Sequence, residues 1–181
     1  MREIALHILD LMENSIRAGA RVIAVSVEEE PDRDLLIISV EDDGPGLRVD
    51  GDTAVDPFYT TKEGKKTGLG LSMLKFRTEA AGGSFHLEQS SLGGLAVRAA
   101  MPLTNVDRSP LGDLAATLAS VVCTNPEVEL RSRLRVGTRE WNVSTADISR
   151  ALPLGGRSEI AVARRMRERI AEGLSALHVT D

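Results

Sequence analysis

The chain has 181 residues, of which 42% are hydrophobic and 27% charged, and this composition is typical of a globular protein with one sizeable core. Its formal net charge of −5 leaves no basic surplus to neutralise phosphates, so we expect no nucleic-acid partner. The single cysteine, Cys123, excludes an internal disulfide and favours a reducing cytoplasm, and the longest uncharged, mainly apolar run, residues 114–126, is too short to cross a membrane.

The run that begins at His7 predicts an amphipathic helix that ends near Gly19. One face is apolar at helical spacing and consists of Ile4, Ile8, Leu11 and Met12, with Ile16 at its margin. The opposite face is polar and carries His7, Asp10, Asn14 and Arg17. This polar face is either a solvated surface or one wall of a binding site. We expect His7 itself to be a partly buried, hydrogen-bonded structural residue.

Two strands of one sheet are predicted next. Residues 21–30 alternate between two faces, and residues 35–41 form a nearly continuous apolar run that is typical of a central strand. The acidic and glycine-containing run 42–46 ends this second strand. Residues 47–67 then lack a clear periodicity and include three lysines. An irregular segment of this length is expected to be functional or mobile.

The rest of the chain predicts two further groups of elements, separated by a polar connector at residues 102–110. The expected elements are a helix over 71–81, a hairpin over 84–89 and 95–101, a helix over 111–123, a hairpin over 128–136 and 139–143, and a helix over 158–174. A domain boundary is placed after residue 104. Residues 105–181 would be a helix–hairpin–helix extension that either packs on the first domain or forms a small docking unit.

Apolar spacing also predicts which side chains the two outer helices bury. The expected buried residues are Leu71, Leu74 and Phe76 in the helix over 71–81, and Ile160, Val162, Met166 and Ile170 in the last helix. The only tryptophan, Trp141, is expected in the core or at a domain interface rather than at a binding hot spot.

Three polar side chains in the first half are suited to nucleotide chemistry. Magnesium binds oxygen ligands and keeps several waters, so the amide oxygen of Asn14 is sufficient for a site shared with phosphates. Asp10, one helical turn earlier, can polarise a water or accept a hydroxyl proton. Asp42 ends an apolar strand, where its carboxylate can accept a hydrogen bond from the exocyclic amine of adenine.

A second glycine pair, Gly68 and Gly70, opens the helix over 71–81. Its backbone can approach a ligand closely, and the free N–H groups of a helix start attract anions. Lys62 and the two lysines at 65 and 66 precede it, either as part of a loop over phosphates or as a solvated surface. The sequence contains no G-x-x-x-x-G-K-[ST] motif and no complete G-x-G-x-x-G motif.

Four segments, LDLMENSIRAGA, VEDDGPGL, DPFYTTK and KTGLGLSMLK, resemble in order and spacing the nucleotide-binding boxes of the GHKL superfamily. This superfamily comprises DNA gyrase, the large heat-shock chaperones, the mismatch-repair clamp and the sensor histidine kinases. The resemblance covers residues 1–104 and is closest to the histidine kinases. It implies a two-layer α/β sandwich, the Bergerat fold, with ATP held between the helices and a mobile lid.

The resemblance also implies roles for particular residues. Asn14 would bind Mg²⁺, and Asp42 would read adenine, with Gly44 and Gly46 shaping the pocket beside it. Asp10 falls at the general-base position, and Arg17 falls where histidine kinases often have a phosphate-facing lysine. The phosphate-binding residues would be Lys62, Thr67, Gly68, Leu69, Gly70 and Leu71.

Three features of the sequence depart from the family pattern. Asp10 stands where the ATPases usually have the longer glutamate. Leu95 and Ala96 stand where a threonine often lies near the adenine. Only six residues precede His7, whereas a histidine kinase needs a dimerising helix with its own phosphoacceptor histidine, so the sequence predicts a stand-alone form.

Several functions remain open at this stage. The first is Mg-dependent phosphotransfer to an unidentified protein partner in trans. The second is a non-enzymatic ATP sensor, or slow ATPase, whose nucleotide state controls partner binding. A gyrase-like clamp would require a long second domain, which the 77 residues after Thr104 are too few to form. A purely structural role would leave the four boxes without a purpose.

Overall fold

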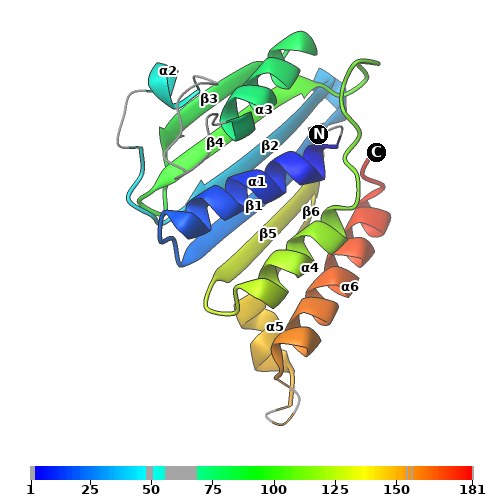
Figure 1. Cartoon of the computed structure of the whole chain (residues 1–181). Helices are drawn as coiled ribbons and strands as arrows, with labels where there is room; N and C mark the ends of the chain where they lie inside the picture. The colour runs from blue at the N-terminus through cyan, green and yellow to red at the C-terminus, as the bar shows by residue number, and fades with distance from the viewer. Residues whose placement is uncertain (1–2, 48–50, 56–68, 154, 156, 181) are drawn as a thin grey trace.

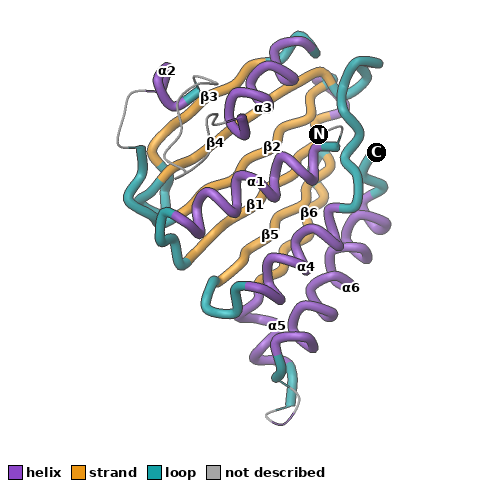
Figure 2. The backbone as a smooth tube through the Cα atoms, viewed as in Figure 1, coloured by secondary structure: helices purple, strands orange, loops and turns teal. Residues whose placement is uncertain are grey.

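The computed structural model of the chain describes residues 3–47, 51–55, 69–153, 155 and 157–180. In these ranges, helices lie over one face of a six-stranded sheet (Figures 1 and 2). The elements in chain order are α1 (Ile4–Arg17), β1 (Val22–Glu30), the 3-10 helix η1 (Pro31–Arg33), β2 (Leu35–Asp42), α2 (Gly51–Ala54), α3 (Leu69–Ala80), β3 (Ser84–Gln89), β4 (Leu95–Pro102), α4 (Leu114–Thr124), β5 (Glu129–Val136), β6 (Arg139–Ser144), α5 (Thr145–Ala151) and α6 (Glu159–Leu177). The predicted two-layer α/β architecture is confirmed.

The strand order of the sheet is β3-β4-β2-β1-β5-β6. Each neighbouring pair is antiparallel except β1 and β5, which run parallel. β2 therefore lies in the interior of the sheet, as its apolar composition predicted. Within the described ranges, no helix combines the length and the hydrophobicity that a membrane span needs.

The apolar face of α1 packs into the core as predicted. Its four stripe residues, Ile4, Ile8, Leu11 and Met12, are each at most 4% exposed. The alternation in β1 is equally clear, because Ile23, Val25 and Val27 face the helices and are almost fully buried. Helix and strand periodicity thus identified the two surfaces that face each other across the layers.

Two predicted core residues are instead exposed. Phe76 is 66% exposed and Ile160 is 72% exposed. Consecutive helical residues are about 100° apart, so a residue two positions from a buried one lies on the far side of the helix. Leu74 is buried in α3, and Val162 is among the buried residues of α6. Phe76 and Ile160 are both two positions away from these residues.

The helix α5 was not predicted, because its seven residues are too short to show a periodic apolar stripe. A local cap marks its start, since the Ser144 hydroxyl accepts a hydrogen bond from the backbone N–H of Asp147. Trp141 is half-buried between β6 and α6. A Cβ atom on Gly173 would lie 2.5 Å from the indole ring, so this glycine lets the helix approach the strand.

The strands after residue 104 continue the sheet of the first part. β5 pairs with β1 over its whole length, from Val22 opposite Glu129 to Glu29 opposite Val136. β6 then forms the outer edge of the sheet. The residues after 104 therefore pack on the first part, one of the two arrangements left open above. The division of the chain into two domains stays a prediction.

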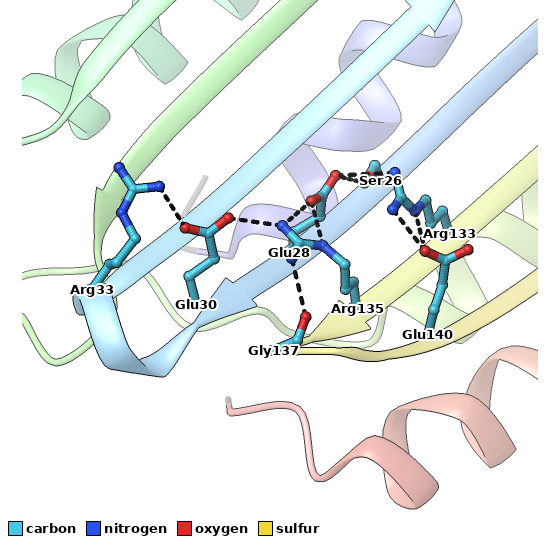
Figure 3. Close-up of polar contacts among 8 residues, drawn as sticks. All are labelled: Ser26, Glu28, Glu30, Arg33, Arg133, Arg135, Gly137 and Glu140. Atoms are coloured by element: carbon cyan, nitrogen blue, oxygen red, sulfur yellow. Dashed lines mark hydrogen bonds and ion pairs between the residues drawn. The ribbon is translucent and has the colours of Figure 1, made fainter.

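A row of ion pairs crosses the seam between β1 and β5 on the sheet face away from the helices (Figure 3). Arg135 of β5 donates from Nε to Glu28 and from Nη2 to Glu30, each at 2.8 Å. Its side chain is 23% exposed, and those of the two glutamates are 18% and 20% exposed. This partial burial makes the cluster stronger than an ordinary surface ion pair.

We expect Arg135→Met to lower the free energy of unfolding by about 1–2 kcal/mol, because two partly desolvated carboxylates would lose their shared cation. Urea denaturation at low salt measures the loss, which should shrink in 1 M salt. Arg33→Met is the matched control, since Arg33 pairs with Glu30 but is 72% exposed. Equal losses in the two variants would contradict a special role for the β1–β5 seam.

Candidate functional site

The polar face of α1 is arranged as the helical spacing predicted. Asp10 and Asn14 are half-buried, and Arg17 is exposed at the end of the helix. The Arg17 guanidinium donates from Nη2 to Asn14 Oδ1 at 2.6 Å. It also lies 3.8 Å from the carboxylate of Glu13. The amide, a carboxylate and a cation therefore lie within two turns of one helix.

The start of α3 meets this face of α1 at Gly70. A Cβ atom on residue 70 would lie 1.7 Å from Asp10 Oδ2 and 3.5 Å from Asn14 Nδ2. A larger residue at position 70 would force the Asp10 side chain to move, so the backbone at the start of α3 lies directly against Asp10 and close to Asn14. The first N–H groups of any helix have no partners within the helix. Asp10, Asn14 and a helix start are thus in one place, while the next residue, Leu71, packs against the core.

Asp42 ends β2 as a buried carboxylate that is 5% exposed. Its Oδ1 accepts hydrogen bonds from the backbone N–H groups of Gly44 at 2.9 Å and Leu95 at 3.1 Å. Its Oδ2 accepts from the hydroxyl of Ser15 at 2.5 Å. Because Ser15 follows Asn14 directly, Asp42 is tied to the same helix that carries the other site residues.

Glycines surround Asp42 closely. A Cβ atom on Gly94 would lie 2.2 Å from Asp42 Oδ1, and one on Gly44 would lie 3.1 Å from the same oxygen. Gly94 also donates its backbone N–H to the carbonyl of Asp42 at 3.0 Å. Gly46 has a φ of +70°, a left-handed conformation that favours glycine, and packs beside Gly94. Gly44 and Gly94 thus lie against Asp42, and Gly46 lies against Gly94, while the role of Gly44 and Gly46 in shaping a nucleotide pocket stays a prediction.

Sequence reasoning missed Ser15 and Gly94. Ser15 had a signal, because it lies four positions after Leu11 on the apolar stripe of α1, where a polar residue needs a buried partner. Gly94 looked like an ordinary hairpin glycine, since its proximity to Asp42 depends on the pairing of β2 with β4. Leu95 lacks the side-chain hydroxyl of the threonine that is common at this place in the family. Its backbone N–H nevertheless donates a hydrogen bond to Asp42 Oδ1.

Asp43, the next residue, stabilises the fold and is not one of the predicted site residues. Its Oδ1 accepts the backbone N–H groups of Arg21 at 2.7 Å and Val22 at 2.9 Å. These hydrogen bonds, from Val22 first, lower the pKa of Asp43 below its usual value. The carboxylate therefore fixes the start of β1 against the end of β2.

His7 is more deeply buried than expected, with an exposed fraction of 2%. Neither ring nitrogen has a hydrogen-bond partner among the described residues, so the expected hydrogen bond is not found there. Burial lowers the pKa of His7, and the positive charge of Arg77 lowers it further. His7 is therefore a neutral imidazole at neutral pH.

Three of the predicted phosphate-binding residues, Lys62, Thr67 and Gly68, lie outside the described residues. Leu69 begins α3, and its backbone is described. The described part of the site therefore offers a buried carboxylate acceptor, an amide oxygen, a second carboxylate and the backbone of a helix start. These are groups that can bind an amine, a hydrated divalent cation and an anion.

The family model described as histidine kinase-, DNA gyrase B- and HSP90-like ATPase matches residues 2–105. The sensor histidine kinase CpxA of Escherichia coli (strain K12) is 34% identical over 100 residues, which are 51% of this chain and 22% of CpxA. The sensor protein kinase CarS of Pseudomonas aeruginosa is 32% identical over 111 residues, which are 60% of this chain and 24% of CarS. The chain thus spans less than a quarter of the length of these relatives.

One solved structure is similar over nearly the whole chain. It is the N-terminal domain of a DNA repair protein, which matches with a TM-score of 0.54 over 96% of this chain and 59% of that chain. The two sequences are 15% identical, so the likeness is one of fold alone.

Proposed function

The chain belongs to the histidine kinase-, DNA gyrase B- and HSP90-like ATPase family, and from this premise we propose that it binds ATP with Mg²⁺ and transfers the γ-phosphoryl group to a protein partner in trans. The similarity to sensor histidine kinases favours phosphotransfer over the other activities of the family. The observation that carries the proposal is the meeting of Asp10, Asn14 and Gly70, with Asp42 tied to the same helix through Ser15. The single cysteine favours the cytoplasm as the site of action.

Asp42 is suited to reading the adenine ring. A carboxylate offers roughly four lone-pair sites, and protein donors use three of them here. The remaining site, on Oδ2, can accept the exocyclic amine of adenine. The three protein hydrogen bonds fix the carboxylate in place before the nucleotide arrives, which lowers the entropic cost of recognition.

Asn14 and the start of α3 are suited to the phosphates. The Asn14 amide provides an oxygen of the kind that Mg²⁺ prefers, and the glycine at position 70 lets a helix start approach the same place. Mg²⁺ would neutralise the negative charge of the phosphates. It would also stabilise the negative charge that develops on the leaving group. Arg17 adds a cation at the end of the same helix face.

Asp10 is suited to act as the base. Its carboxylate touches the backbone at the start of α3, next to Asn14. During transfer, the acceptor atom of the partner would form a bond to the γ-phosphorus as the bond to the β-phosphate oxygen breaks and ADP leaves. The proton of the acceptor would go to Asp10.

A second candidate is an ATP sensor that does not transfer phosphate. It is favoured by the aspartate at position 10, which is one methylene shorter than the glutamate usual in the ATPases of the family. In this case, nucleotide occupancy would change the affinity for a partner protein without turnover.

We expect calorimetry to detect ATP binding that is stronger with Mg²⁺ than with EDTA. No binding at millimolar ATP would reject the proposal. Incubation with γ-labelled ATP and the proteins encoded beside this chain then separates the functions. Label on a partner indicates phosphotransfer, free labelled phosphate indicates an ATPase, and binding with neither supports the sensor.

A further inference from the structure

The bond between Arg17 and Asn14 determines how the Asn14 amide is oriented. A guanidinium only donates hydrogen bonds, so the atom that faces Arg17 at 2.6 Å must be the amide oxygen. The amide nitrogen then lies on the side of Gly70, 3.5 Å from the position of a Cβ on that residue. The oxygen is therefore directed toward the guanidinium, and the nitrogen is the amide atom nearer to Gly70.

The same oxygen is the atom that the proposed function assigns to Mg²⁺. Magnesium requires near-octahedral oxygen ligands at about 2.1 Å and tolerates little distortion. A guanidinium on the same oxygen would add a positive charge a few ångströms from the divalent ion, where two cations repel strongly. One amide oxygen therefore cannot serve both partners well.

We propose that Arg17 and Mg²⁺ compete for the amide oxygen of Asn14, so that the arriving metal releases the guanidinium to the nucleotide phosphates. This inference rests on the proposed function. The release is easy, because the Arg17 side chain is 47% exposed and its second contact, with Glu13, is a long surface ion pair. Arg17 is thus a positioning residue for Asn14 without metal and a phosphate ligand with it. Metal binding and phosphate capture become coupled.

The test is ATP binding without metal. We expect Asn14→Ala to bind ATP about threefold to tenfold more tightly than the parent in EDTA, because Arg17 is released to the phosphates. With Mg²⁺ the same variant should bind more weakly than the parent. Adding Arg17→Met should remove the gain in EDTA. Asn14→Leu, which keeps the size of the side chain, should behave as Asn14→Ala does.

Asn142→Ala is the matched control, because it makes the same substitution at an exposed position of β6. Its ATP affinity in EDTA should equal that of the parent. The inference is overturned if neither Asn14 variant gains affinity in EDTA, or if the gain persists after Arg17→Met. Failure of the proposed function has a different signature, namely no ATP binding by the parent with Mg²⁺.

Discussion

Asp42→Asn is expected to weaken ATP binding about 100-fold while the chain stays folded. In the variant, the amide oxygen would take the place of Oδ1 and accept the hydrogen bonds from the backbone N–H groups of Gly44 and Leu95. The amide nitrogen would then replace Oδ2 and point a donor at the donor amine of adenine. Losing a charged hydrogen bond in a buried site costs about 1.5–3 kcal/mol, which corresponds to this change in affinity.

The variant should fold because the Ser15 hydroxyl can rotate to accept from the new amide nitrogen. Calorimetry with Mg-ATP measures the loss of affinity. Asp43→Asn is the matched control, since Asp43 holds only backbone groups of the β1 start. It should lower the unfolding free energy and leave ATP affinity unchanged. If Asp42→Asn binds ATP as the parent does, Asp42 does not read the base.

A change in base preference would identify the atom concerned. Inosine triphosphate carries a carbonyl oxygen where ATP carries the exocyclic amine. The parent should therefore prefer ATP, because the Asp42 carboxylate would repel this oxygen. Asp42→Asn should reduce or reverse the preference, since the amide nitrogen can donate to the carbonyl. An unchanged preference would place adenine recognition elsewhere.

Asp10→Asn should reduce turnover by about 10²–10⁴-fold, the usual contribution of a general base. The amide retains the size of the carboxylate, so the contact with Gly70 and the affinity for ATP should change little. The measurement is the rate of label transfer to the partner, or of phosphate release, at saturating Mg-ATP. Asn142→Asp is the control, because it makes the reverse substitution on β6, at the outer edge of the sheet. It should leave the rate unaffected.

Unchanged turnover in Asp10→Asn would refute the base assignment, and no turnover in the parent would favour the ATP sensor. The close packing also bears on why this residue is an aspartate. Oδ2 already reaches the backbone of Gly70, so the longer side chain of a glutamate would have to place its carboxylate elsewhere. We therefore expect Asp10→Glu to keep only part of the parent's activity.

The sequence predicted much of the fold, because local periodicity carries the information. The alternation from Val22 to Val27 and the apolar stripe of α1 each predicted correctly which face of the element is buried. Phe76 and Ile160 were misassigned because an apolar side chain near a helix face does not have to lie on it. The short helix α5 has too few turns for periodicity to appear.

For the candidate site, the sequence motifs predicted Asp10, Asn14, Asp42 and Gly70, and the structure brings Asp10 and Asn14 against Gly70 and ties Asp42 to the helix of Asn14. The contacts that hold them together are non-local and could not be read from spacing. Ser15 reaches across 27 positions to Asp42. Likewise, the helical spacing places Arg17 near Asn14 but does not determine that the two side chains form a hydrogen bond, because both could contact solvent instead.

The parallel pairing of β1 with β5 has a consequence for synthesis of the chain on the ribosome. Arg135 and its partner Glu28 are 107 positions apart, so β1 is made long before the strand that will cover its second edge. Until then the second edge of Val22–Glu30 lacks its neighbouring strand, and we expect the unfinished protein to aggregate more readily through this edge. A fragment that stops at residue 104 would keep this liability permanently, even though it holds all four nucleotide-binding segments.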